Sequence, residues 1–276
     1  MSVNNVIVVS DLHCGCRLGL CPPRIHMDGG GTYEQGAVQR LTWQWWNEFW
    51  DEWVPRVTRG EDYAVVVNGD AVDGAHHNSK SQISQNFADQ HNIAMTILRP
   101  IVEKCQGRFY MVRGTEAHVG QGAENEERLA QALGAVQNRA GEHTFYEIWM
   151  KVGHGVAHFS HHIGSTGRAA YETSALMAEL MEMYVEASKW REIPPDIVVR
   201  SHRHRHIKVE VPTENIYGTV FTTPGWQGKT GYVMKIPGGR TQRAQMGGAL
   251  IRCGDEELYT RHFTRSLPRP PVEVIE

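Results

Sequence analysis

Three histidines at alternate positions, His202, His204 and His206, follow a short apolar run that ends before Arg200. Such a run, bounded by polar residues, is typical of a buried strand. Residues two apart on an extended chain share a face, so His202 and His204 can direct their imidazoles at one point beyond the strand. Imidazole is the commonest protein ligand for transition metals. The stretch therefore indicates a metal site or, as the alternative, a polar turn with surface histidines.

Metal-ligand residue types recur after other short apolar runs, each broken by glycine or polar residues. Carboxylates and imidazoles together suit divalent ions such as Mn, Fe or Zn. In an open α/β sheet, ligands bind beyond the carboxyl ends of the strands, so the repeated pattern predicts one metal centre at that edge. Along the chain, these residues are Asp11 and His13; Asp70 and Asp73; Thr115, Glu116 and His118; and His161.

The composition is that of an ordinary globular protein, with 276 residues, 41% hydrophobic residues and a net charge of −3. This balance argues against a global basic field for nucleic acid and leaves a local basic patch open. No apolar run reaches membrane-spanning length, and the amino terminus lacks a signal pattern. The odd count of five cysteines favours free thiols over a zinc site. It also favours a cytoplasmic location.

The elements that position these residues are strands and helices in alternation, followed by a β-rich part. We expect strands at 4–10, 62–70, 108–112, 144–152, 155–160 and 197–200, and helices at 84–104, 123–134 and 168–190. Short alternating runs at 207–211, 220–223, 232–236, 248–253 and 258–263 predict antiparallel strands, and the proline-rich tail 264–276 is expected to be extended. We expect a single domain, 1–276, with a separate carboxyl-terminal module as the alternative.

Residues 34–57 contain five of the eight tryptophans, and Trp46, Trp50 and Trp53 follow helical spacing. The pattern favours a helix packed on a sheet. The alternative is a homo-oligomer interface, because tryptophan is enriched at interface hot spots.

The order of the motifs resembles the calcineurin-like metallophosphoesterases, whose pattern is D-x-H, G-D-x-x-D, G-N-H-[DE], a strand-terminal H and G-H-x-H. The resemblance covers about residues 4–206, and the early Gly/Pro loop with the Trp-rich segment is similar to phage or prophage-type members. The matching stretches are Asp11-x-His13, Gly69-Asp70-x-x-Asp73, Gly114-Thr115-Glu116-Ala117-His118, His161 after a strand, and Ser201-His202-Arg203-His204.

The resemblance implies a four-layer α/β/β/α sandwich of two mixed sheets, with residues 207–263 completing the second sheet and the metal site on the strand-end loops. It implies a binuclear centre for two divalent ions, manganese first, with iron, zinc or nickel as alternatives. It places Asp11, His13 and His204 on the first ion, His161 and His202 on the second, and Asp70 on both. Asp73 would orient the catalytic imidazole.

The third motif departs from the family, since Thr115 and Glu116 stand where the family has Asn and His. We expect Glu116 to supply an oxygen to the second ion and His118 to donate a proton to the leaving group. The alternative for His118 is a loop histidine. Arg113, Arg203 and His162 flank the motifs and are expected to contact substrate phosphate.

The expected function is that of a hydrolase, a two-metal phosphoesterase in which metal-activated hydroxide attacks a phosphate ester. Among phosphoesterases, we favour a phosphodiesterase or nuclease-like activity on nucleic acid or nucleotides. The alternatives are a phosphomonoesterase or protein phosphatase, and a non-catalytic metal-binding or scaffold protein with the same fold.

Overall fold

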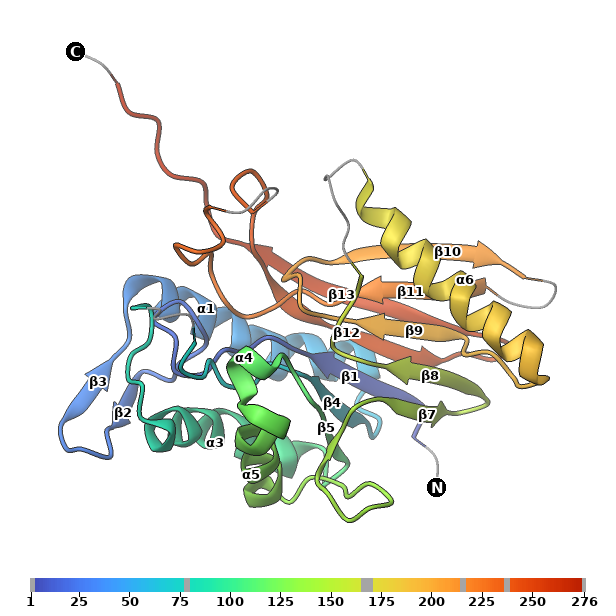
Figure 1. Cartoon of the computed structure of the whole chain (residues 1–276), viewed down its shortest axis with the longest axis horizontal. Coiled ribbons are helices and arrows are strands. Elements are labelled where there is room, and N and C mark those ends of the chain that lie inside the picture. The colour runs from blue at the N-terminus through green and yellow to red at the C-terminus, as the bar shows by residue number, and fades with distance from the viewer. Residues whose placement is uncertain (1–2, 77–79, 165–170, 214–216, 236–238, 275–276) are drawn as a thin grey trace.

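The computed structural model describes residues 3–76, 80–164, 171–213, 217–235 and 239–274 (Figure 1). Its larger sheet has the strand order β13-β12-β1-β4-β5-β6. Strands β1, β4, β5 and β6 run parallel, and β12 and β13 join antiparallel beside β1. The bounds are Asn5–Val9 (β1), Ala64–Asn68 (β4), Phe109–Val112 (β5), Thr144–Phe145 (β6), Gln245–Cys253 (β12) and Leu258–Ser266 (β13).

The second sheet has five strands in the order β10-β11-β9-β8-β7. Its strands β8, β9 and β11 are parallel, whereas β7 and β10 pair antiparallel at the two edges. The bounds are Ile148–Val152 (β7), Gly155–Phe159 (β8), Ile197–Arg200 (β9), Ile207–Pro212 (β10) and Tyr217–Thr222 (β11); a separate hairpin pairs Arg24–His26 (β2) with Thr32–Glu34 (β3).

Helices cover the outer faces of the two sheets (Figure 1). Helix α6 packs on β10 and β11 of the second sheet, and the other long helices pack on the larger sheet. The bounds are Ala37–Glu48 (α1), the π-helical turn Phe49–Trp53 (η1), Val54–Thr58 (α2), Phe87–Lys104 (α3), Glu116–Val119 (α4), the 3₁₀ turn Gln121–Ala123 (η2), Glu124–Leu133 (α5) and Glu172–Trp190 (α6).

Alternation along β1 explains how the layers are held together. Ile7 and Val9 point into a core shared with the helices, and Val6 and Val8 point into a core shared with the second sheet. Because successive residues of a strand face opposite sides, a strand that is apolar at every position is buried on both faces. A third core, around Leu176 of α6, seals the outer face of the second sheet.

The mixed α/β architecture predicted from the sequence is confirmed, and so are the three long helices to within a few residues at their ends. In the described part of the segment 207–263, β10 and β11 extend the second sheet, whereas β12 and β13 belong to the larger sheet. The expectation that the whole segment completes the second sheet is therefore wrong. Strand β12 is buried at positions 246–252 and pairs with β1 in the middle of the larger sheet. The expected pattern identified strands but not their partners.

A second correction concerns residues 232–235 of the expected strand 232–236, which form turns. Tyr232 and Met234 are 65% and 50% exposed, so this apolar run has no sheet face to cover. Residue 236 lies outside the described residues. After β13, residues 267–274 form no helix or strand and lead away from the body (Figure 1).

The tryptophan-rich segment packs on the larger sheet. Trp46, Trp50 and Trp53 are at most 7% exposed, and Trp43 and Trp45 are partly buried against the same core. The packed-helix interpretation is therefore confirmed, while the oligomer interface stays a prediction. No disulfide joins the cysteines in the described residues, and all five are free. Within the described residues, no helix is both long enough and apolar enough to traverse a lipid bilayer.

Candidate metal centre

The predicted ligands lie at one edge of each sheet because they follow parallel strands. In the larger sheet the strands concerned are β1, β4 and β5, and in the second sheet they are β8 and β9. Parallel strands end at the same edge, so side chains that follow them meet there. The residues contributed are Asp11 and His13 after β1, Asp70 and Asp73 after β4, Thr115 and His118 after β5, His161 after β8, and His202 and His204 after β9.

Backbone hydrogen bonds join the loops that carry these ligands. The amides of Asp11 and His13 donate to the carbonyls of Gly69 and Asp70 at 2.9 and 3.0 Å. In the second sheet, the amide of Ser201 donates to the carbonyl of His161 at 2.9 Å. The ligand positions are thus fixed by main-chain contacts, which do not depend on side-chain rotamers.

Five of the nine non-glycine residues with positive φ in the described part are predicted ligands. A non-glycine residue in this region costs on the order of 1 to 3 kcal/mol and persists only where its surroundings enforce it. Such strain clusters at functional sites, because it holds side chains in one required direction. The five are Asp11 (54°), His13 (45°), Asp70 (54°), His202 (72°) and His204 (51°).

Two glycines permit the close approach of the loops. A Cβ on Gly69, whose φ is 86°, would lie 2.3 Å from Nδ1 of His161. A Cβ on Gly114 would lie 2.2 Å from Oδ1 of Asp70. Both distances are far below van der Waals contact, so only glycine fits at either position.

The first group of potential ligands is formed by Asp11, His13 and His204. The Nε2 atoms of His13 and His204 are 3.2 Å apart, and Nε2 of His204 lies 3.3 Å from Oδ1 of Asp11. This oxygen is buried and has no hydrogen-bond partner within the described structure. A buried carboxylate oxygen costs free energy when unpaired, and a cation between these three atoms would satisfy it.

The second group consists of Asp11, Asp70 and His161, so it shares Asp11 with the first group. Nε2 of His161 lies 3.1 Å from Oδ2 of Asp70 and 4.0 Å from Oδ1 of Asp11. Nδ1 of His161 donates to the carbonyl of Asn68 at 2.7 Å. This bond fixes the ring and directs Nε2 at the carboxylates, as is usual for metal-ligating histidines.

Thr115 occupies the space between the second group and two exposed histidines. Its backbone amide donates to Oδ1 of Asp70 at 2.7 Å, and its hydroxyl donates to Oδ2 at 3.2 Å. The same hydroxyl lies 3.1 Å from Nδ1 of His202 and 3.4 Å from Nε2 of both His161 and His162. His161, His162 and His202 also form a potential ligand group of their own.

Asp73 is buried behind the first group and is held by several donors. Its Oδ1 accepts from Nδ1 of His13 at 3.2 Å and from Nε2 of Gln227 at 3.2 Å, and its Oδ2 accepts from Nε2 of Gln82 at 2.9 Å. Nδ1 of His118 donates to the backbone carbonyl of Asp73 at 2.7 Å but lies 4.0 Å from Oδ1. The carboxylate of Asp73 therefore orients His13, and the backbone carbonyl of Asp73 orients His118.

The electrostatics of the cluster call for positive charge. Burial alone would raise the pKa of Asp11 and Asp70. His204 and His161 instead lower the pKa of Asp11, and His161 and His13 lower the pKa of Asp70, so both values lie below the usual range. Burial would also lower the pKa of His161, yet Asp70 and Asp11 raise it to about 10. The carboxylates of Asp11 and Asp70 belong to one group, whose ligand atoms lie within 4.8 Å of one another. Two buried carboxylates this close need a compensating charge, which a divalent cation supplies. The donor set and the unpaired oxygen of Asp11 thus fit divalent metal ions.

Not all predicted site residues come together. Glu116 begins α4, is exposed, and lies outside every group of potential ligands among the described residues. The guanidinium of Arg113 is directed elsewhere, because it contacts Glu142 at 2.9 Å and Thr144 at 2.9 Å. Arg203 is half-buried and donates to the carbonyl of Gly164. His162 does lie at the cluster, beside His202.

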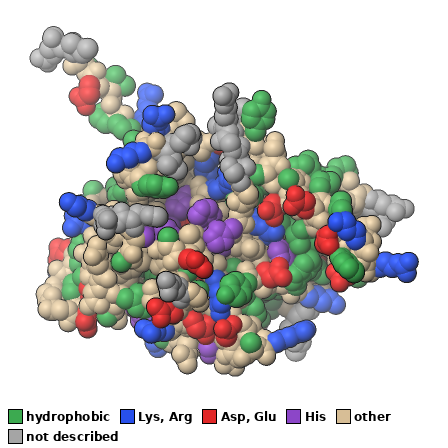
Figure 2. All heavy atoms as spheres, in the orientation of Figure 1, with side chains coloured by type: hydrophobic (Ala, Val, Ile, Leu, Met, Phe, Trp, Pro, Cys, Tyr) green, Lys and Arg blue, Asp and Glu red, His purple; other side chains and the backbone are tan. Residues whose placement is uncertain are grey.

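Three further residues complete the site, and the sequence indicated His76 only by its position close behind Asp73. Gln82 and Gln227 hold the carboxylate of Asp73, and His76 joins Asp73 and His118 in a further group of potential ligands. Gln227 follows β11 in Pro224-Gly225-Trp226-Gln227, and this strand-end position was the only signal. In Figure 2, histidine side chains gather in a hollow near the middle of the face shown.

Comparisons with known proteins found no matching family model and no matching curated protein. Among solved structures, the chain is similar to vacuolar protein sorting 29 from Cryptosporidium parvum, with 10% identity, 97% of this chain and 100% of that chain covered, and a TM-score of 0.37. A Vps29 double mutant from Entamoeba histolytica shows 12% identity, with 95% of this chain and 99% of that chain covered, and a TM-score of 0.38. The Thermus thermophilus sulfate thiohydrolase SoxB shows 13% identity, with 96% of this chain and 56% of that chain covered, and a TM-score of 0.39. Likeness this distant carries no argument about activity or partners.

Proposed function

We propose that the chain is a two-metal phosphoesterase of the metallophosphoesterase type, with the four-layer α/β/β/α sandwich of that family. One observation carries the proposal. Carboxylates and imidazoles from the ends of strands in both sheets converge in adjoining groups that share the buried Asp11, whose Oδ1 has no hydrogen-bond partner within the described residues. The order of the motifs supports the same function, and the three apolar cores support the layering.

In this proposal Asp11, His13 and His204 hold the first ion, His161 and His202 hold the second, and Asp70 contacts both. When bound, the two ions activate water as a nucleophile and neutralise charge on the phosphoryl oxygens. Manganese suits this mixture of carboxylates and imidazoles, with iron, zinc and nickel as alternatives. Thr115 lies at the second group with its hydroxyl among three histidines, so it takes the place we had expected for Glu116.

The residues around the ligands position them and handle the proton. The buried carboxylate of Asp73 accepts from Nδ1 of His13, which leaves Nε2 of His13 for the metal. Nδ1 of His118 is engaged with the Asp73 carbonyl, so Nε2 is the nitrogen that exchanges a proton with the leaving group. His162 and Arg203 lie at the rim of the cluster, where they can contact the phosphate ester. Arg113 has no such part.

We propose a phosphodiester substrate, from nucleic acid or a nucleotide. A phosphodiester carries two ester groups on the phosphorus. The exposed histidines His162 and His202 leave the second group open to solvent, where the ester group that is not cleaved can lie. The test is hydrolysis of bis-p-nitrophenyl phosphate and of p-nitrophenyl phosphate. The protein is first freed of metal with a chelator and then loaded with Mn²⁺. We expect Mn²⁺-dependent turnover of the diester, and greater turnover of the monoester would contradict this choice of substrate.

A matched pair of variants connects turnover with the site. His161→Asn removes the imidazole that faces Asp70 and Asp11, and we expect it to lower turnover by at least about a hundredfold. His91→Asn, on α3 outside the groups of ligands, is the control and should retain turnover. Equal turnover of the two variants would contradict the proposed site.

The second candidate is a non-catalytic metal-binding scaffold. It is favoured by Thr115, a weak neutral ligand where the resembling family has Asn, and by the exposed position of Glu116. The same experiment separates the two functions. Stoichiometric Mn²⁺ binding by calorimetry, without hydrolysis of either ester under Mn²⁺, Zn²⁺ or Ni²⁺, would establish the scaffold and reject the enzyme.

A further inference from the structure

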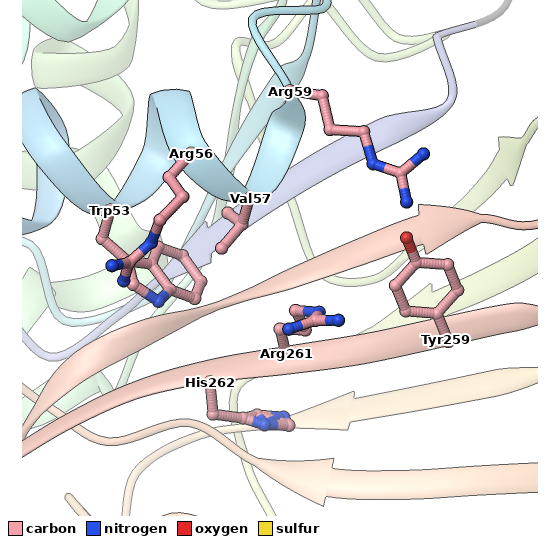
Figure 3. A pocket seen from close by; sticks show the side chains of 7 residues that line it. All are labelled: Trp53, Arg56, Val57, Arg59, Tyr259, Arg261 and His262. Atoms are coloured by element: carbon pink, nitrogen blue, oxygen red, sulfur yellow. The ribbon is translucent and has the colours of Figure 1, made fainter.

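A second hollow lies between the π-helical turn η1, helix α2 and the edge strand β13 (Figure 3). We call it the α2–β13 pocket. Its volume is about 440 Å³, which falls within the range of small-molecule sites. It shares no residue with the groups of potential metal ligands. Its lining residues are Trp53, Arg56, Val57, Arg59, Tyr259, Arg261 and His262.

Three arginines give the pocket its charge. Arg56 and Arg59 come from α2 and its carboxyl-terminal cap, and Arg261 comes from β13. All three are exposed, and within the described residues none has a carboxylate within ion-pair distance. The pKa of Glu61 is lowered first by its hydrogen bond with Arg252 and also by the charge of Arg59. The Glu61 carboxylate forms its ion pair with Arg252, at 2.7 Å.

The arrangement is local, because the whole chain carries a net charge of −3. Three guanidinium groups repel one another, and a solvated surface gains nothing by gathering them around a hollow. Figure 3 shows the Arg59 side chain extending from the helix toward β13, where the hydroxyl of Tyr259 points toward it. This convergence from two separate elements is typical of an anion-binding site.

The remaining walls offer aromatic surface. Trp53 is 7% exposed and forms part of one wall, and Tyr259 is half-buried on β13. His262 follows Arg261 on β13, so its ring faces the opposite side (Figure 3) and packs against His206, just before β10 of the second sheet, with centroids 3.6 Å apart.

We propose that the α2–β13 pocket binds a phosphate-bearing ligand of nucleotide size. Arginine pairs with phosphate oxygens through two parallel hydrogen bonds, and aromatic rings and guanidinium planes stack on nucleobases. The volume exceeds the need of a single small anion and suits a nucleotide. A free nucleotide and the phosphodiester strand of a nucleic acid present the same chemistry. The proposal is independent of the metal centre.

The test is calorimetric binding to the full-length protein in excess EDTA, so that metal ions contribute nothing. The two probes are adenosine triphosphate and a single-stranded oligothymidylate of twelve nucleotides. We expect at least one probe to bind with an affinity that falls as salt rises. Tighter binding of the oligonucleotide identifies a strand as the ligand, and tighter binding of the nucleotide identifies a small molecule. Absence of binding by both probes overturns the proposal.

Two double variants with the same change of charge decide whether the pocket is the site. Arg56→Gln with Arg261→Gln removes two of the pocket guanidinium groups, and we expect at least about tenfold weaker binding. Arg99→Gln with Arg269→Gln removes two exposed arginines elsewhere and should leave affinity unchanged. Equal affinities of the two double variants overturn the proposal. Thermal melts check that both fold, and Mn²⁺-dependent diester turnover should be the same in both.

Discussion

The carboxylate of Asp73 offers a decisive test of the metal centre, because it touches His13 without facing the proposed ions. In Asp73→Asn, Oδ1 can still accept from His13 and Gln227, whose donors lie at 3.2 Å. The new amide nitrogen faces the Gln82 donor, which lies at 2.9 Å from Oδ2. Gln82 can adapt by turning its amide, because its Oε1 is buried without a hydrogen-bond partner in the described structure.

The expected loss of folding stability is therefore small, about 1 kcal/mol for one altered hydrogen bond. The effect on metal binding is larger. Asp73 raises the pKa of His13 against the opposing effect of burial, so its charge makes His13 a more basic ligand. Loss of such a partner typically weakens metal affinity by about 10- to 100-fold, or about 1.4 to 2.7 kcal/mol.

The assay is calorimetric titration of metal-free Asp73→Asn with Mn²⁺, beside thermal melts of the same samples. Asp89→Asn on α3 is the control, since Asp89 is also buried, at 3% exposure, and accepts from the amide of Asp28 at 2.6 Å. We expect weaker Mn²⁺ binding only for Asp73→Asn. Unchanged affinity, or equal weakening by both variants, would refute the role given to Asp73.

Three further predictions follow from contacts at and away from the cluster. Thr115→Asn should strengthen binding of the second Mn²⁺ about tenfold by adding an amide oxygen, and Thr115→Val should not; equal titrations of the two variants would exclude Thr115 from the site. Burial, then the charges of His206 and Lys208, lower the pKa of His262 from 6.5 to about 3. The unfolded chain alone therefore binds this proton between these values, so stability is lost as pH falls through the window. His262→Phe should flatten urea-unfolding stability against pH by at most about 5 kcal/mol, and an unaltered slope would disprove it. Trp226→Ala, at a fully buried position, should cost about 3 to 5 kcal/mol in urea unfolding, and a loss below 1 would contradict its central packing.

The sequence was informative where one residue type has one physical role. Apolar runs at every position, as in residues 64–67, predicted strands buried on both faces, and the polar residues that follow them predicted the edge at which ligands meet. Glycines at 69 and 114 follow two of these runs, and the structure shows that both lie where loops approach closely. These features depend on local chemistry, and local chemistry can be read from the chain.

The partners of elements and side chains could not be predicted in this way. Strand β12 pairs with β1 although about 240 residues separate them, and alternation contains no information about such a pairing. Arg113 beside the third motif resembled a phosphate ligand, yet its guanidinium turns to Glu142. Gln82 and Gln227 lie far apart in sequence and meet only at Asp73. Long-range contacts determined each of these outcomes.

The groups of potential ligands span the junction of two sheets, and this arrangement bears on stability as well as on the proposed catalysis. Asp11, His13 and Asp70 follow strands of the larger sheet, while His161 and His204 follow strands of the second. An ion bound between them would act as a cross-link between the two halves of the molecule and oppose their separation on heating. At a free ion concentration one hundred times the dissociation constant, such linkage adds about 2.7 kcal/mol to folding stability. Metal supply would then determine how much of the chain is folded.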